Sequence, residues 1–304
     1  RTREGGGRVT AYTPVDVTPD TDEWGIERRN SLGASEVAAV IGESSFGDTP
    51  LSVYLSKVGR SRPFDPILSL IGHGVEPVIT EWVRNYHPGI GTVRPGFMAR
   101  SNQHPHLHAT FDRLVDTPGG ITVPLQLKSS TVFKRHNWDN GVPVDYLVQE
   151  DVECLVHGAP YAYLAVWHIG STEFVLHKLF ARPERQQQII TRTTAFWHDH
   201  VIPRRPPEPT LGDDLDELYP ATVGRTVRSD RDTLDAVEFL RERAAQRRAF
   251  AADAVADENN AKFEIERFMK DATELIDPFT NKVIHTWRPD KNGSRRHFSP
   301  KDSK

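Results

Sequence analysis

Two stretches, His108-Ala109-Thr110-Phe111-Asp112-Arg113 and, after a short Gly-rich turn, Leu125-Gln126-Leu127-Lys128, decide how this chain is interpreted. Both stretches are short and have the composition of β-strands. Side chains alternate between the two faces of a strand, so residues 126 and 128 point to the same face. The two stretches therefore predict neighbouring strands that bring an aspartate, an amide and a lysine together.

These groups match the needs of phosphodiester hydrolysis. One or two Mg²⁺ or Mn²⁺ ions activate a water and neutralise the growing phosphorane charge, provided that the protein offers oxygen ligands in a fixed geometry. We expect Asp112 to anchor the metal, with Gln126 and the Leu127 carbonyl as further oxygen ligands. We expect Lys128 to contact the attacking water or the phosphate. Glu76, from a preceding helix, reaches the same centre through water or a second ion.

Taken alone, this pattern is weak. Asp112 and Arg113 also suit an ordinary turn, and residues 126–128 also suit a solvated strand face. An amide at 126 carries no charge, so we expect weaker metal binding and slower turnover than a carboxylate gives. Gln126 is either a natural variant that is compensated elsewhere or a Glu→Gln change that traps substrate. The sequence leaves both explanations open.

Composition indicates an ordinary globular protein. The 304 residues are 37% hydrophobic and 26% charged, enough for one core with an appendage. The net charge of −4 argues against indiscriminate nucleic-acid binding, although a metal-dependent nuclease can be acidic overall. The single cysteine, Cys154, excludes an internal disulfide and suits a reducing compartment. Without a run of about 18 apolar residues, a cytoplasmic protein without membrane contact is expected.

The chain is expected to have four parts. Residues 1–20 are rich in Gly, Thr and Pro and are predicted to be a flexible arm. Residues 21–203 form the predicted core, and residues 204–229, which begin in a Pro-rich and then acidic stretch, form a linker. Residues 230–304 are predicted to be a helical C-terminal extension with a basic tail.

Hydrophobic periodicity predicts an α/β core with a mixed central sheet flanked by helices. Helices are expected over residues 35–41, 50–58, 72–86, 146–157 and 183–201, and strands over 106–115, 121–129, 162–169 and 174–180. In the extension, residues 230–256 and 259–276 suggest a two-helix hairpin, and 283–287 a strand.

Ordered motifs lie between residues 24 and 200. They are Trp24–Ala38, Gly72-x-x-x-Glu76-Pro77, His104–Val115, Leu125–Lys128 and Pro143-x-x-Tyr146-x-x-Gln149. Together they resemble the YqaJ-like viral recombinase family, relatives of phage lambda exonuclease. The resemblance implies a restriction-endonuclease-like fold of the PD-(D/E)xK class. It also implies a metal-dependent 5′ to 3′ exonuclease acting on linear double-stranded DNA ends in recombination by strand annealing.

Residue roles follow from the resemblance position by position. It implies that Asp112 and residue 126 bind two Mg²⁺ or Mn²⁺ ions, that Glu76 and Lys128 are catalytic, and that Gln149 lies near the scissile phosphate. Arg28 and Ser35 correspond to residues that take the terminal 5′ phosphate, a role that a guanidinium fork and a helix start support physically. Without the family context, an ion pair of Arg28 with Glu27 or Glu36 is the better interpretation.

A mixed basic and aromatic stretch over residues 133–138 is expected to be a loop beside Lys128. Lys134, Arg135 and Trp138 are candidates for tracking the duplex, and a solvated loop with one anchoring Trp is the alternative. His104, His106 and His108 alternate on one strand, and a polar face is favoured there over a zinc site.

The resemblance further implies a ring-shaped homotrimer, a single-strand annealing protein as partner, and a phage or prophage origin. Two rivals remain. One is a nuclease subunit or endonuclease of the same fold in a repair or defence complex. The other is a catalytically weak DNA-end-binding protein, which Gln126 makes plausible.

Overall fold

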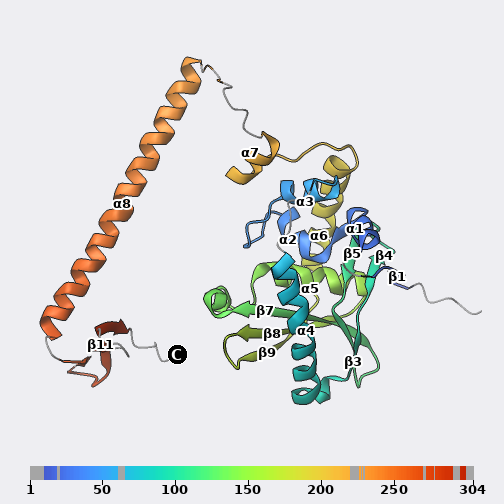
Figure 1. Ribbon diagram of the computed structural model, residues 1–304, viewed down its shortest axis with the longest axis horizontal. Coiled ribbons are helices and arrows are strands. Elements are labelled where there is room, and N and C mark those ends of the chain that lie inside the picture. The colour runs from blue at the N-terminus through green and yellow to red at the C-terminus, as the bar shows by residue number, and fades with distance from the viewer. Residues whose placement is uncertain are drawn as a thin grey trace, which may run out of the picture. The chain divides into compact units, whose positions relative to one another are not determined.

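The computed structural model describes residues 10–18, 21–60, 66–219, 226, 228, 230–269, 272–276, 278–289 and 295–298. The chain divides into two compact units, residues 1–221 and residues 222–304 (Figure 1). Each unit is described by itself.

A five-stranded mixed sheet forms the centre of the first unit. Its strands lie in the order β3 (Thr92–Pro95), β6 (Arg113–Asp116), β7 (Thr122–Thr131), β8 (Tyr161–Ile169) and β9 (Phe174–Phe180). β7 and β8 run parallel, and the other neighbours are antiparallel. The parallel pair requires a crossover, which η3 (Val132–Trp138) and α5 (Val144–His157) provide.

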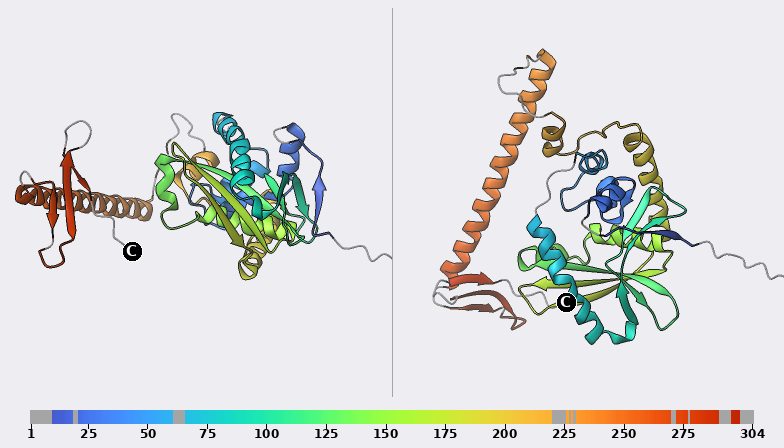
Figure 2. Two further views of the ribbon diagram at one scale, coloured as in Figure 1. Left: turned by 90° about the horizontal axis from the view of Figure 1, so that it is seen from below. Right: turned by 45° about the vertical axis from the view of Figure 1, so that its right-hand side comes forward.

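The two faces of this sheet are covered by different helices (Figures 1 and 2). Leu125 and Leu127 pack with Ile79 and Val83 of α4 (Pro66–Tyr86) on one face. Leu164 and Val166, from alternate positions of β8, pack on the other face with Trp138 of η3 and Tyr146 of α5. Strand periodicity therefore assigns β7 side chains to the α4 side at odd numbers and to the α5 side at even numbers.

A smaller four-stranded sheet lies in the same unit. Its order is β1 (Tyr12–Val15), β4 (Met98–Ser101), β5 (Leu107–Thr110) and β2 (Leu32–Gly33). Its strands pack into the largest apolar cluster together with helices that precede and helices that follow β4 and β5 in the chain. Those helices are α2 (Val37–Val40), α3 (Pro50–Lys57), α5 and α6 (Pro183–Phe196). The unit also contains the short elements α1 (Asp22–Arg29), η1 (Ala34–Glu36), η2 (Pro88–Ile90) and η4 (Trp197–Val201).

Helix ends follow local chemistry. Thr49 caps α3 by accepting a hydrogen bond from the Ser52 N–H, and Pro50 occupies the first helical turn, where its missing N–H costs nothing. α5 ends at Gly158, whose φ of 79° lies in the left-handed region that favours glycine.

The second unit holds one long helix and a small sheet. α8 (Arg231–Met269) is followed by the antiparallel strands β10 (Glu274–Ile276), β11 (Val283–Pro289) and β12 (Arg295–Phe298). Large apolar side chains of α8, including Phe239, Phe250 and Phe263, are exposed. Among the described residues, no helix combines the length and apolar character needed to span a membrane.

The mixed sheet flanked by helices confirms the predicted fold class, and several boundaries need correction. Residues 12–15 were assigned to a flexible arm, but they form β1 and pair with β4. Residues 212–218 were assigned to a linker, but they form α7 (Gly212–Leu218), where Asp214 accepts a hydrogen bond from the Thr49 hydroxyl at 2.6 Å. The rest of the arm, except residues 10, 11 and 16–18, and the tail beyond residue 298 lie outside the described residues.

Two further predictions of elements were wrong. The expected helical hairpin is a single helix, since no glycine or proline interrupts residues 231–269. The expected strand over residues 106–115 is broken at Phe111 and Asp112 into β5 and β6, which belong to different sheets. This break turns out to place the central residue of the candidate site.

Candidate active site

The candidate site lies where β6 and β7 separate. β6 pairs with β7 from Asp116 opposite Thr122 to Arg113 opposite Leu125, and the ladder stops there. β7 continues beside β8 as far as Thr131. Asp112 immediately precedes β6, and its Oδ2 accepts a hydrogen bond of 2.8 Å from the Leu127 N–H on the edge of β7 that β6 has left. Asp112 thus lies at the base of a fork between two strands.

The turn between β3 and β4 fixes the backbone of Asp112. The Gly96 N–H donates to the Asp112 carbonyl at 3.2 Å, and the Phe111 N–H donates to the Phe97 carbonyl at 3.1 Å. A Cβ on Gly96 would lie 1.8 Å from the Phe111 carbonyl oxygen, closer than any real contact. Glycine is therefore required where the turn meets the break between β5 and β6.

A pocket of about 270 Å³ opens at the fork. Five residues selected from the sequence line it together, and they come from α4, from the break before β6 and from β7: Glu76, Asp112, Gln126, Leu127 and Lys128. Glu76 Oε2 lies 3.5 Å from Arg113 Nη1. The five selected residues, as far as 52 positions apart in sequence, thus share one pocket.

Charges in the pocket perturb one another. Burial raises the pKa of Asp112, and the positive charge of Lys128 opposes that rise. Burial also raises the pKa of Glu76, and the charge of Asp112 raises it further. The Lys128 ammonium lies 5.3 Å from the centre of the Tyr146 ring of α5, so this side chain reaches toward the α5 side of the sheet.

Gln126 is the pocket residue that tests whether a cation would fit here. Its side chain is 4% exposed, and within the described residues its Oε1 has no hydrogen-bond donor. A buried acceptor without a donor is costly, and a hard cation satisfies it. Together with the Asp112 carboxylate and the Leu127 carbonyl, this oxygen forms a donor set that fits Mg²⁺ or Mn²⁺. Over the described ranges, no three His, Cys, Asp or Glu side chains form a ready-made metal cluster, so the donors here are of mixed type.

α5 contributes acidic residues that sequence reasoning missed. Gln149, which was selected, donates from Nε2 to Glu153 Oε1 at 2.8 Å. Glu153 is fully buried, and burial together with the charge of Asp112 raises its pKa to about 8. Glu150 is also buried, and its pKa lies well above the usual value because of burial and of Glu153. Acidic residues in a helix are normally solvated, so only the i, i+4 spacing from Gln149 to Glu153 hinted at a shared face.

Arg28 and Ser35 lie outside the fork pocket. The Arg28 guanidinium stacks on the Trp24 ring at 4.7 Å and lies 3.7 Å from Glu36, so the predicted alternative of an ion pair with Glu36 is present. Glu36 is held more closely by Lys57 Nζ at 2.5 Å and by the Gly33 N–H at 2.7 Å. Ser35, at the start of η1, is exposed.

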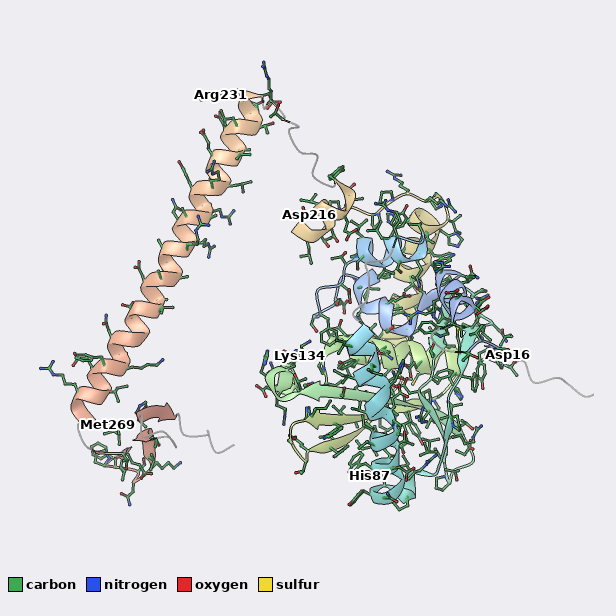
Figure 3. All side chains as sticks on the ribbon, in the orientation of Figure 1. Asp16, His87, Lys134, Asp216, Arg231 and Met269 are labelled. Carbon is green, nitrogen blue, oxygen red and sulfur yellow. The ribbon has the colours of Figure 1, made fainter. Side chains whose placement is uncertain are left out.

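The stretch expected to be a loop is the 3₁₀ helix η3. Trp138 is 9% exposed and stacks on Tyr146 with 5.5 Å between ring centres, which favours an anchoring role over contact with DNA. Arg135 pairs with Glu173 at 2.9 Å, and Lys134 is exposed on the surface of the first unit (Figure 3).

The three alternating histidines are used locally. His108 is buried and hydrogen-bonds through Nδ1 to the Ser31 hydroxyl at 2.8 Å, and His106 lies 3.1 Å from the Thr193 hydroxyl. Burial lowers the pKa of His108 to about 3 and that of His106 to about 4, so both rings are neutral near pH 7. Of the three, only His108 lies in β5, while residues 104 and 106 precede it, so the predicted alternation along one strand was wrong.

A mixed sheet that forks at a buried aspartate and has a helix on each face fits the predicted restriction-endonuclease-like class of α/β folds, with a glutamine at 126 where that class has an acidic residue. Residues 23–159 match the YqaJ-like viral recombinase domain. The motifs singled out in the sequence fall almost entirely within this match.

Comparisons with individual proteins agree. The uncharacterized protein YqaJ of Bacillus subtilis is 26% identical over 186 residues, which cover 60% of this chain and 56% of that protein. The chain therefore spans little more than half the length of this curated relative. An alkaline exonuclease from Laribacter hongkongensis, LHK-Exo, is similar in structure with a TM-score of 0.50 and 16% identity, covering 59% of this chain and 92% of that one. Its complex with dAMP matches equally well. At this identity the likeness establishes the fold.

Proposed function

We propose that this protein is a metal-dependent exonuclease that degrades linear double-stranded DNA from 5′ to 3′ and resects ends for phage-type recombination by strand annealing. The observation that carries the proposal is the fork pocket, which Asp112, Gln126 and Lys128 line together and in which the Gln126 oxygen lacks a donor among the described residues. The exonuclease that shares the fold binds dAMP, which supports a nuclease reaction here as well.

Five residues of the pocket, and Gln149 of α5, have a defined part in the proposed reaction. Bound Mg²⁺ or Mn²⁺, with two ions proposed per site, supplies Lewis acidity and a more acidic water. Asp112, Gln126 and the Leu127 carbonyl hold the ion, and Lys128 orients the attacking water or the scissile phosphate. Glu76, whose pKa is raised by burial and by Asp112, exchanges a proton with water at its carboxylate oxygens. Gln149 reaches the phosphate from α5.

Recognition of the DNA end is assigned to a second group. Arg28 and Ser35 take the 5′ phosphate. The ion pair of Arg28 with Glu36 is long, at 3.7 Å, and the Trp24 ring covers one face of the guanidinium, so its N–H groups can donate to a phosphate. The exposed Lys134 and its neighbour Arg135 follow the duplex backbone. We further propose a homotrimeric ring that passes one strand and hands it to a single-strand annealing protein.

Digestion of matched substrates tests the proposal. Linear duplex with labelled 5′ ends should lose mononucleotides from that end in Mg²⁺, and covalently closed circles of the same sequence should stay intact. Cutting of circles favours an endonuclease or a nuclease subunit of the same fold. Binding of ends in Ca²⁺ without cleavage in Mg²⁺ or Mn²⁺ favours an end-binding protein, a second candidate that the uncharged Gln126 supports.

Mass measurement tests the ring. Light scattering after gel filtration should give three subunits at micromolar concentration, with or without a duplex end. A monomeric mass under both conditions contradicts the ring and leaves the nuclease assignment standing.

A further inference from the structure

One stripe of side chains on α5 packs toward the face of the central sheet that carries the even-numbered residues of β7. It consists of residues spaced three or four apart: Tyr146, Gln149, Glu150, Glu153 and His157. The Tyr146 ring lies 5.3 Å from the Lys128 ammonium, and the His157 ring packs at 5.5 Å on Phe111, which precedes Asp112. The stripe is thus held at one end on Lys128 and at the other end on Phe111, the residue before Asp112. Glu153 belongs to the part of the stripe between these two contacts.

Gln126 points toward the same stripe. In the parallel ladder Gln126 is opposite Leu164, and Lys128 is opposite Val166. Leu164 and Val166 pack with Trp138 and Tyr146, which places these positions on the α5 side. The Gln126 side chain therefore shares a face with the Lys128 side chain and with the acidic residues of α5.

Four oxygens in this region lack a donor among the described residues, and two of them belong to the Glu150 carboxyl, which lines a separate pocket. Glu153 is fully buried; its Oε1 accepts from Gln149, while its Oε2 finds no partner in the part of the chain that the structure describes. The same holds, over those residues, for Gln126 Oε1. The nearby Asp112 carboxylate adds acceptors only. A group of buried acceptors that lacks donors is satisfied by a cation. After burial, the charge of Asp112 is the largest cause of the raised pKa of Glu153, as expected if both carboxyl groups face the same space.

We propose that Glu153 binds the divalent cation together with Asp112 and Gln126, and supplies from α5 the carboxylate charge that position 126 lacks. The inference rests on the proposed function for the reaction and deepens it by naming the ligand that compensates for Gln126. Two carboxylates then face the ion, as they would if position 126 were a glutamate. Gln149 acts as a positioning residue, because its amide fixes one oxygen of Glu153 and leaves the other toward the ion.

Glu150 provides a matched control. It lies on the same stripe and is as well buried as Glu153, but it lines a separate pocket with Asp151, Cys154 and Lys178. Among charged neighbours, Glu153 raises the pKa of Glu150 more than Asp112 does. Glu150→Gln removes one buried carboxyl from the same helix turn without removing a proposed ligand.

Calorimetric titration of Mn²⁺ into the full-length chain, without DNA, tests the proposal. We expect Glu153→Gln to weaken Mn²⁺ affinity by about tenfold or more, and Gln126→Glu in the Glu153→Gln background to restore it to within about threefold. Glu150→Gln should leave the affinity within about twofold of the unaltered chain. The Mn²⁺-induced rise in melting temperature should follow the same order, which excludes a folding defect as the cause.

Equal Mn²⁺ affinity of Glu153→Gln and the unaltered chain overturns the inference, and so does a larger loss for Glu150→Gln or a failure of Gln126→Glu to restore binding. Absence of Mn²⁺ binding to the unaltered chain up to millimolar concentration, with and without a duplex end, overturns it as well. Cleavage of linear duplex is measured in parallel. If the unaltered chain cleaves DNA but Glu153→Gln binds Mn²⁺ as tightly as the unaltered chain, only the role of Glu153 as a ligand is contradicted. If Mn²⁺ binding follows the expected order but no variant cleaves DNA, only the exonuclease assignment is contradicted.

Discussion

Two clusters of buried charged residues in the first unit differ in how their acceptor oxygens are paired. In the Glu36 cluster, which consists of Arg28, Glu36, Lys57 and His108, both oxygens of the carboxylate have partners among cations and a backbone N–H. In the fork cluster, which consists of Asp112, Gln126, Lys128 and Glu153, two acceptor oxygens have no donor anywhere in the described ranges. A carboxylate whose partners are built in stabilises the fold, whereas acceptors left without donors indicate a place for an ion.

The largest expected effect separates activity from stability in the fork cluster. Asp112→Asn removes the main carboxylate ligand, so single-turnover cleavage of linear duplex in Mg²⁺ should fall by about a thousandfold or more. Burial raises the pKa of Asp112, which means that the folded protein disfavours its charge. Melting in EDTA should therefore be unchanged or occur at a higher temperature. Retained cleavage, or a strongly lowered melting temperature, would show that Asp112 is structural.

The opposite pattern is expected in the Glu36 cluster. Lys57 is 7% exposed, and Lys57→Met leaves the Glu36 carboxylate without its closest cation. Loss of one partner of a buried pair should lower the free energy of unfolding by about 3 kcal/mol. Urea unfolding measures this loss, and Glu36→Gln combined with Lys57→Met should recover part of it. Mn²⁺ affinity of the folded fraction should not change, and a change there would mean that the two clusters are linked.

Arg28 sharpens the comparison, because it belongs to the paired cluster yet has the longest ion pair in it. If it binds the DNA end, Arg28→Ala should cost about 1.5 to 3 kcal/mol toward 5′-phosphorylated ends, a loss of roughly 10- to 150-fold. Ends with a 5′ hydroxyl are the control and should be affected little. Equal losses on both ends assign Arg28 to folding, like Lys57.

The smallest effects are opposite slopes of stability with pH, measured as melting temperature in EDTA. Burial lowers the pKa of His108 from 6.5 to about 3, so below about pH 6.5 only the unfolded chain takes up this proton and stability falls as pH falls. The raised pKa of Glu153 works the other way. Between 4.5 and about 8 only the folded chain keeps this proton, so stability falls as pH rises through that window.

Glu153→Gln should reduce the loss of stability as pH rises toward 8, which is called the alkaline slope. It should not change the loss of stability as pH falls below 6.5, the acid slope. Mn²⁺ should also flatten the alkaline slope, since the ion favours the ionised carboxylate. An alkaline slope that persists in Glu153→Gln assigns it to another buried acid, for which Glu150→Gln is the next variant to measure.

Sequence reasoning found the site residues that local geometry brings together and missed those that are placed by contacts between distant parts of the chain. Strand alternation and the family motifs were enough to bring Asp112, Gln126 and Lys128 into one pocket with Glu76, because period-two geometry is local. Glu153 was missed, since its burial arises from packing of α5 against two sheets, which no window of sequence around it contains. Trp138 was selected for the basic residues beside it, yet Leu164 and Tyr146 from other elements bury it.

The fold shows the same division. Helix starts with a cap and a proline, as at Thr49 and Pro50, were found where local chemistry dictates them. The strand β1 and the helix α7 were missed because each is held by a distant partner: β1 by β4, and α7 through a hydrogen bond that joins residues 165 positions apart. The break at Phe111 and Asp112 likewise depends on which of two sheets each half can join.

Gly96 carries a consequence for how sequences of this kind are compared. It offers no functional group, and it stands 16 positions before Asp112, outside every motif by which the site is found. Yet a single methyl group there would collide with the backbone that holds the aspartate. A related chain could keep the aspartate, the lysine and all their neighbours and still be inert because of an alanine in this turn. A search that scores only the reactive residues would count that chain as an enzyme, so the glycine of this turn should be scored as a motif position in its own right.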